Sequence, residues 1–480
     1  MEYSERKNSM IIDGLTLCIS LALLCASVVG SVYAGTRDTL PAEFLRILTS
    51  PGPLVTDYFG VGSMPATFLN AGLCGLTMWA FMTLLPGPSH ANTLAGYFLV
   101  VAHAFYGLNF LNMWPCFLAS FAYLGVRRLN YNENLHICMF TTCFSPFVSE
   151  LLFRYTIGDA WLPGRVQLTV RGVLLTLCFT VFVALVAPAI LPGTKAWHKG
   201  YNLYNGGLAF GMLGMFLYNF MYRTMGVRAP AVPIMTNPIY EQVNHSYSVF
   251  CHGFFLLLFA ACVFAGFLLN GASFRGLSVL FTDTGYQSNF ARKYGMPLCL
   301  INIGLCGTFF LLYLNLAIFF TNGAGFTGPT FGIVFAALTF TAMGQHPRNV
   351  WPIFLGFPLL SLVSWVFNAQ LAGEASWTIS TQAYLNSVAF ATGLCPLVGR
   401  YGKGAGVAAG FLCAALCNAT SALHGGLMLY NGGFTAGVAT LILLPILEHY
   451  APAPRGAMAE HIDLSDMLTI KESAPRDETE

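Results

Sequence analysis

The chain has 480 residues, of which 56% are hydrophobic and 9% are charged, and its mean hydropathy is +0.65. Soluble domains carry about 25% charged residues, so a water-soluble fold could not cover its surface with so few charges. The net charge of +2 excludes a basic field for nucleic acid. We therefore expect a multi-pass protein of the cell membrane, in contact with the lipid bilayer.

Two series of seven apolar segments follow each other along the chain, and we expect all of them to be helical. A complete crossing needs about 20 residues, so the shorter segments, which Gly or Pro interrupts, are candidates for re-entrant helices. The first series is 11–34, 64–86, 92–108, 113–126, 135–153, 168–192 and 201–222. The second series is 246–270, 294–320, 325–344, 349–371, 383–399, 404–421 and 427–447. The predicted fold is an all-α polytopic membrane protein.

A motif that occurs twice indicates how the two series are related. Leu-Tyr-Asn-Gly-Gly begins at Leu203 and again at Leu429, and both copies continue to a third glycine. Repeats of this kind indicate a duplicated unit. Other pairs keep the same order: Met64-Pro65 with Met296-Pro297, Asn70 with Asn302, Trp114-Pro115 with Trp351-Pro352, Thr142 with Thr392 and, more weakly, Asp57 with Asp283. Residues 1–240 and 241–450 are therefore predicted to be two transmembrane repeats, and 451–480 a disordered cytoplasmic tail.

The number of segments in each repeat predicts their relative orientation. Seven is odd, so if every segment crosses the membrane, the second repeat is inverted relative to the first. With the N-terminus inside, more Lys and Arg residues fall on the cytoplasmic side than outside, in agreement with the positive-inside rule. We expect inverted repeats, and parallel repeats are the alternative.

Polar residues that occur in both repeats are candidates for binding a solute. Amides and hydroxyls can replace the hydrogen bonds that a small polar molecule leaves behind in water, and inverted-repeat transporters place them near the midplane. The alternative is that each pair only joins helices through interhelical hydrogen bonds. The candidates are Asn70 and Asn302, Asn112 and Asn349, Thr142 and Thr392, Tyr204 and Tyr430, and Asn205 and Asn431.

Two charged residues also occupy equivalent places. Glu150 and Arg400 each lie four residues after a proline, at Pro146 and Pro396. In inverted repeats they could form a charge pair across the axis, since a buried charge in a membrane needs a partner or water. Arg154, four residues after Glu150, is a simpler local partner for the same carboxylate.

Sequence signatures of catalysis and of metal binding are missing. The 14 cysteines are scattered through apolar segments, without Cys-x-x-Cys or other metal-ligand spacing. The sequence has no His-Glu-x-x-His motif, no phosphate loop and no serine-histidine-aspartate order of a hydrolase. We therefore expect no enzyme, no cofactor and no metal.

Some of these motifs resemble a known family. Asp57-Tyr58-Phe59, Asn70-Ala71-Gly72 and the repeated Leu-Tyr-Asn-Gly-Gly resemble an uncharacterised prokaryotic membrane family, in which a domain of unknown function is duplicated within one chain. The resemblance covers about residues 10–450 and implies no activity.

A weaker resemblance is to urea transporters. Gly62-Ser63 before Asn70, Ser145-Pro146-Phe147 and the repeated Tyr-Asn-Gly are similar to elements of that family. It implies a trimeric inverted-repeat channel, and hence a homo-oligomer. Ala71-Gly72 stands where those transporters have a second Asn-Pro, so the likeness concerns the fold more than the solute.

The predicted function is membrane transport of a small polar, uncharged solute, in a channel-like or facilitator-like pathway between the repeats. One alternative is an ion-coupled secondary transporter that uses Asp57, Glu150, Asp283 or Arg400. A further alternative is a non-transporting membrane scaffold, in which the repeated motifs only pack helices.

Overall fold

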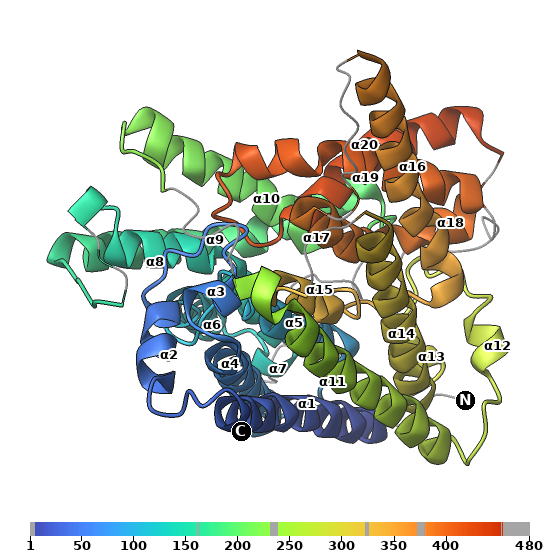
Figure 1. Ribbon diagram of the computed structural model, residues 1–480. Helices are drawn as coiled ribbons and strands as arrows, with labels where there is room; N and C mark the ends of the chain where they lie inside the picture. The colour runs from blue at the N-terminus through green and yellow to red at the C-terminus, as the bar shows by residue number, and fades with distance from the viewer. Residues whose placement is uncertain are drawn as a thin grey trace, which may run out of the picture.

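The protein is described here by a computed structural model, and all regular elements in its described part are helices (Figure 1). The structure describes residues 5–160, 162, 164–230, 239–321, 326–371, 379, 381–452 and 454. The predicted tail, 451–480, therefore lies almost entirely outside the described residues.

Ten α-helices form the first half of the chain and ten form the second half, in the described residues. The first set is α1 (Glu5–Tyr33), α2 (Leu40–Leu48), α3 (Tyr58–Val61), α4 (Met64–Leu84), α5 (Ala91–His103), α6 (Trp114–Val126), α7 (Tyr131–Thr141), α8 (Ser145–Phe153), α9 (Val170–His198) and α10 (Asn205–Tyr218). The second set is α11 (Ile239–Leu269), α12 (Leu277–Leu280), α13 (Phe290–Lys293), α14 (Met296–Thr321), α15 (Gly328–Ala336), α16 (Pro347–Leu371), α17 (Gln382–Ala391), α18 (Cys395–Tyr401), α19 (Lys403–Leu423) and α20 (Asn431–Tyr450).

The described part of the chain contains 9 helices that are long and apolar enough to cross a membrane. They are Glu5–Tyr33, Met64–Leu84, Tyr131–Phe153, Val170–His198, Val249–Leu269, Met296–Ile318, Pro347–Gln370, Lys403–Leu423 and Asn431–Tyr450. Every apolar segment predicted from the sequence contains a helix of the structure. The prediction of a helical, multi-pass membrane protein is therefore confirmed.

The two halves repeat the same packing. Helix α1 packs along α4 as α11 packs along α14, and α6 contacts α9 as α16 contacts α19. Likewise α5 contacts α7, and α15 contacts α17. Across the halves, α5 lies beside α15 in the middle of the molecule, and α10 lies beside α20 (Figure 1).

Two short helices, α5 and α15, occupy the interior because their sequences are largely apolar on every side. Helix α5 has 13 residues and α15 has 9, and nearly all of them are buried. A helix that is hydrophobic on every side has no face to offer to water. The Thr327 side chain caps α15 by accepting a hydrogen bond from the Thr330 amide at 3.0 Å.

Helices α10 and α20 cross at the glycines of the repeated motif. A Cβ on Gly207 would lie 2.5 Å from the backbone of Gly433. A Cβ on Gly211 would meet a ring of α20 at 2.2 Å, and one on Gly437 would meet a side chain of α10 at 2.6 Å. The motif is therefore glycine-rich because two helix backbones touch there, as in small-residue contacts of membrane helices.

One predicted correspondence is wrong. The N-terminal cap of α3 is Asp57, and the cap of the equivalent helix α13 is Asn289 rather than Asp283. Each cap accepts a hydrogen bond from a backbone amide at the start of its helix. Asp57 and Asp283 share a residue type but not a place in the fold.

Candidate functional site

The two copies of the repeated motif meet through their tyrosines. Tyr204 and Tyr430 directly precede α10 and α20, and their ring centroids are 5.3 Å apart. The amide before Tyr204 donates to the Gly393 carbonyl at 2.9 Å, in the second half of the chain. The amide before Tyr430 donates to the Cys143 carbonyl at 3.0 Å, in the first half. Each tyrosine is therefore anchored to the other half of the chain, in the same way.

Aromatic side chains surround the two tyrosines in matching pairs. The Tyr204 ring lies 5.5 Å from Phe340 and 5.4 Å from Phe390, both in the second half. The Tyr430 ring lies 5.2 Å from His103 and 6.3 Å from Phe140, both in the first half. We name the two tyrosines and these four neighbours the tyrosine cluster.

Three hydroxyl groups in and beside the tyrosine cluster are buried without a hydrogen-bond partner in the described part of the chain. They belong to Tyr106, Tyr204 and Tyr430, which are 0%, 3% and 2% exposed. The Tyr106 ring lies 5.1 Å from that of His103, so it borders the cluster. A buried hydroxyl without a partner costs about 1–3 kcal/mol, and buried polar groups are rarely left so. These three hydroxyls are therefore a group of buried polar atoms, close to the contact between the two halves, that the described protein atoms leave unsatisfied.

The predicted solute-binding residues Asn205 and Asn431 lie beside the tyrosines, but their side-chain amides form hydrogen bonds with other protein atoms. Asn205 donates to the Leu191 carbonyl at 2.8 Å and accepts from Thr194 at 2.8 Å. Asn431 donates to the Cys417 carbonyl at 3.0 Å. These bonds tie the start of α10 to α9, and the start of α20 to α19.

Asn70 and Asn302 hold the turns that end α5 and α15. Asn70 donates to the carbonyls of Ala104 and Leu108, at 2.7 and 3.0 Å. Asn302 donates to the corresponding carbonyls of Thr341 and Gln345, at 2.8 and 2.7 Å. Both side-chain amides donate to backbone carbonyls that lie outside the regular hydrogen-bond pattern of a helix.

Asn112 and Asn349 lie in the same turns. Asn112 donates to the Gly107 carbonyl at 3.0 Å, and Asn349 to the Gly344 carbonyl at 2.9 Å. Their side-chain oxygens accept backbone amides three residues earlier, at 2.7 and 2.9 Å. The side chains of Asn70, Asn112, Asn302 and Asn349 thus stabilise non-helical backbone in the turns after α5 and α15.

Thr142 and Thr392 begin the 3₁₀ turns that join α7 to α8 and α17 to α18. Their hydroxyls donate to carbonyls three residues earlier, of Met139 at 2.6 Å and of Ala389 at 2.8 Å. Of the ten predicted solute-binding residues, only the two tyrosines have side-chain polar atoms that are buried and without a partner in the described structure.

The predicted charge pair between Glu150 and Arg400 is wrong. The Glu150 carboxylate accepts from Nε of Arg154 at 2.8 and 2.9 Å, and from its Nη2 as well. The Arg400 guanidinium lies 4.5 Å from the centroid of the Tyr286 ring. Arg154, four positions after Glu150, already faces its carboxylate, so Glu150 is paired without a contact between the halves.

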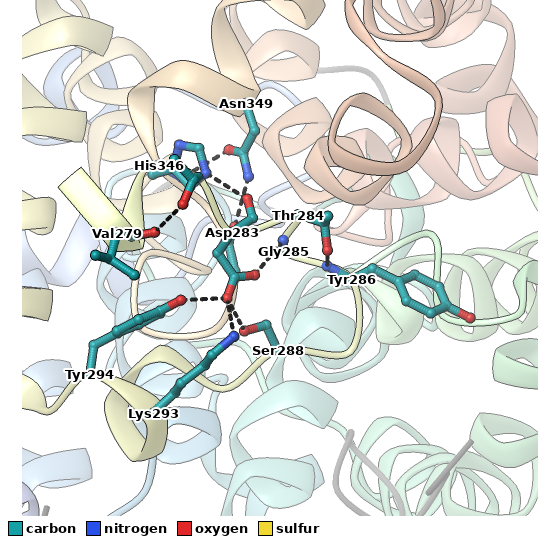
Figure 2. A network of polar contacts seen from close by, with 12 residues as sticks. Val279, Asp283, Thr284, Gly285, Tyr286, Ser288, Lys293, Tyr294, His346 and Asn349 are labelled. Carbon is teal, nitrogen blue, oxygen red and sulfur yellow. Dashed lines mark hydrogen bonds and ion pairs between the residues drawn. The ribbon is translucent and has the colours of Figure 1, made fainter. Parts of the chain in front are cut away.

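Asp283 lies in a dense polar network between α12 and α13 (Figure 2). Its carboxylate accepts from Lys293 and Tyr294, both at 2.7 Å, and from the Gly285 amide at 2.9 Å. Burial alone would raise the pKa of Asp283, but these donors and the Lys293 charge outweigh it and hold the pKa below its usual value. Asp283 is therefore a paired, ionised carboxylate.

A pair of histidines that was not predicted from the sequence lies beside the repeated asparagines. His198 binds the Asn205 side-chain oxygen through Nε2 at 3.0 Å, and His424 binds the Asn431 oxygen at 3.0 Å. The offset between His198 and His424 is the same as that between the two asparagines. This equal offset is visible in the sequence, but both histidines lie in the connections between the apolar segments.

Comparison with known proteins supplies a family. The family model described as "Protein of unknown function (DUF1576)" matches residues 36–223 and 269–449, which is more than half of the chain. The chain belongs to this family. One matched DUF1576 region lies in each half of the chain, as expected of an uncharacterised duplicated domain. No curated protein and no solved structure matches the chain.

Proposed function

We propose that this protein passes a small polar, uncharged solute across the membrane, along a pathway between the two repeats, and that the tyrosine cluster binds the solute. The main support is the group of three buried hydroxyls on Tyr106, Tyr204 and Tyr430, which have no partner in the described residues. A molecule with two or three hydrogen-bonding groups would satisfy them and remove their unfavourable burial.

The neighbours of the tyrosines support an uncharged solute. The ring neighbours named above are Phe340, Phe390, Phe140 and His103, and none of these four carries a carboxylate, ammonium or guanidinium group. A charged solute would lose hydration there without gaining a counter-ion. Aromatic walls with hydroxyl groups suit a molecule with flat apolar faces and polar edges.

The reciprocal contacts support repeats that are related by a two-fold axis at the two tyrosines, as inverted repeats are. Tyr204 contacts Phe340 and Phe390 as Tyr430 contacts His103 and Phe140, and the backbone bonds beside them match in the same way. A two-fold axis between the rings relates such contacts, and a solute site on that axis is typical of inverted-repeat transporters. The asparagines then serve the site indirectly, because they hold the turns behind it.

Solute flux into proteoliposomes tests this function. Urea, simple amides and small polyols are offered to vesicles that contain the wild-type protein, Tyr204→Phe with Tyr430→Phe, or the control Tyr97→Phe. The Tyr97 hydroxyl is also buried but lies against Ser20 and Thr16, away from the cluster. We expect flux of at least one solute, which the double substitution reduces about 5- to 150-fold, as for two hydrogen bonds of about 0.5–1.5 kcal/mol each. Absence of flux for every solute in folded wild-type protein, or equal flux in the double variant, would refute the proposal.

A further inference from the structure

Asp57 is a buried carboxylate with only half of its oxygens engaged. It lies between α2 and α4, outside the long apolar helices, and is 4% exposed. Oδ1 accepts the amides of Phe59 at 2.9 Å and of Gly328 at 3.1 Å. Oδ2 has no hydrogen-bond partner in the described part of the chain. Oδ2 of Asp57 can therefore bind one proton.

Asp57 joins the two halves of the chain. Gly328 is the first residue of α15, so the carboxylate of the first half binds the N-terminus of a buried helix of the second half. A Cβ on Gly328 would lie 2.6 Å from Oδ1 and 3.0 Å from the Phe105 carbonyl oxygen. The contact therefore requires glycine at position 328. The partial positive charge at the N-terminus of α15 favours the ionised form of Asp57.

Elements around Asp57 provide no neutralising base. The cation on α2, Arg46, is exposed, and the carboxylate on α2, Glu43, bonds to Ser63 at 2.5 Å. Within the described residues no ion pair involves Asp57. The elements that contact α3 are α2, α4, α15 and the turn after α5, and their titratable and charged side chains are Glu43, Arg46, Cys74 and Tyr106, with Tyr58 on α3 itself. Burial raises the pKa of Asp57 to about 7, although the amides of Phe59, Gly328 and Gly60 oppose the rise.

The other carboxylate between short helices shows the contrast. Asp283 has a lysine, a tyrosine and a backbone amide on its oxygens (Figure 2). Asp57 has two backbone amides on one oxygen and, among the described residues, no cation. Two carboxylates whose surroundings push their pKa values apart take different roles: one stays ionised, and the other can gain and lose a proton near neutral pH.

Movement of α15 would reach the tyrosine cluster. A Cβ on Gly332, in the middle of α15, would lie 2.9 Å from the Tyr106 ring, so the helix packs directly on one of the three hydroxyl-bearing side chains. Loss of the proton leaves a buried charge, which favours hydration of Asp57 and separation of α3 from α15. Gain of the proton favours the packed arrangement seen here.

We propose that Asp57 is a proton-binding site that couples solute passage to proton movement, by controlling the contact between α3 and the N-terminus of α15. This proposal rests on the proposed transport function. On uptake, an O–H bond forms between Oδ2 and a proton from water on one side of the membrane. On release, that bond breaks and the proton passes to water on the other side, so each cycle regenerates the carboxylate.

The equivalent position in the second half supplies a suitable variant. Asn289 caps α13 and accepts the Arg292 amide at 3.0 Å. Asparagine is thus already used at this place in the fold, so Asp57→Asn keeps the cap and removes the titration. Asp283→Asn is the matched control, because it removes a carboxylate that is already paired.

Infrared difference spectra of the purified full chain, recorded between about pH 5 and about pH 9, detect protonation directly. We expect a carboxylic-acid carbonyl band that disappears with a midpoint near neutral pH, is absent in Asp57→Asn and is retained in Asp283→Asn. The same spectrum in wild type and Asp57→Asn would overturn the assignment of the proton site, whether or not any solute is transported.

Flux under a pH gradient tests coupling separately. We expect a gradient of one pH unit to sustain up to about tenfold solute accumulation in wild type, if one proton accompanies one solute. Asp57→Asn should carry the solute without accumulation. Accumulation that follows sodium rather than protons, or that is unchanged in Asp57→Asn, would overturn coupling at Asp57 while leaving the proposed solute pathway intact. Absence of flux in every sample would instead count against the pathway itself, and coupling would fall with it.

Discussion

Replacing Tyr204 or Tyr430 by phenylalanine removes a hydroxyl and keeps the ring. The ring contacts with Phe340, Phe390 and His103 hold the side chains in place in the structure. Because neither hydroxyl has a partner in the described residues, the substitution breaks no intramolecular hydrogen bond. It also removes a buried polar group whose burial without a partner costs about 1–3 kcal/mol. We therefore expect both variants to be as stable as wild type, or more stable by up to that amount.

Tyr97→Phe provides the opposite case at equal burial. The Tyr97 hydroxyl lies 2.8 Å from Ser20 Oγ and 2.8 Å from the Thr16 carbonyl, so α5 is bonded to α1. Interhelical hydrogen bonds in membrane proteins contribute about 0.6 kcal/mol each on average, so the loss of both costs about 1.2 kcal/mol. We expect Tyr97→Phe to be less stable and to keep its solute flux.

Unfolding in mixed detergent and SDS, followed by circular dichroism, gives the free energies of unfolding for all three variants without solute. The expected order is Tyr204→Phe and Tyr430→Phe at or above wild type, and Tyr97→Phe below it. A loss of more than about 1 kcal/mol in either cluster variant would refute the reasoning, because it would mean that the hydroxyl already has a strong partner within the protein.

Three further changes test the packing and the charges. Gly433→Ala would place a Cβ 1.6 Å from Cδ1 of Tyr204, so we expect a loss of about 1–3 kcal/mol or more in the same unfolding assay, whereas Gly14→Ala, with open space around it, should change stability little. Glu150→Gln should cost about 3–5 kcal/mol, because it leaves the Arg154 charge without its carboxylate; a double-mutant cycle should give coupling with Arg154 and none with Arg400. The raised pKa of Asp57 means that the folded state binds more protons than the unfolded state between about pH 4 and about pH 7, so stability should fall as pH rises through this window, and Asp57→Asn should remove that fall.

Much of the helical framework could be predicted from hydrophobicity and repetition. Apolar segments long enough to be helical mark every long helix, and the repeated Leu-Tyr-Asn-Gly-Gly motif marks the crossing of α10 and α20. Both signals are local in the sequence, because each depends on residues close together in the chain. Repetition in the sequence marked Tyr204 and Tyr430 as equivalent residues, and the structure adds that their rings are in contact.

The partners of polar side chains could not be predicted in the same way. Repetition of Asn70 and Asn302 indicated a common role, but only coordinates reveal that their amides satisfy the turns after α5 and α15. A carboxylate can pair with any base that folding brings near, and for Glu150 the nearest in sequence is also the partner in space. The contact of Asp57 with Gly328 joins residues from different halves, and no local sequence pattern predicts it.

The central claim is that the hydroxyls of Tyr106, Tyr204 and Tyr430 form a site for a polar guest between the two halves. An electron cryomicroscopy map of the protein in lipid, at a resolution that resolves ordered water, tests it most directly. We predict non-protein density within hydrogen-bond distance of at least two of these hydroxyls, replaced by solute density when the transported molecule is added. Dry packing around all three hydroxyls, or hydrogen bonds from each to another protein atom, would contradict the claim.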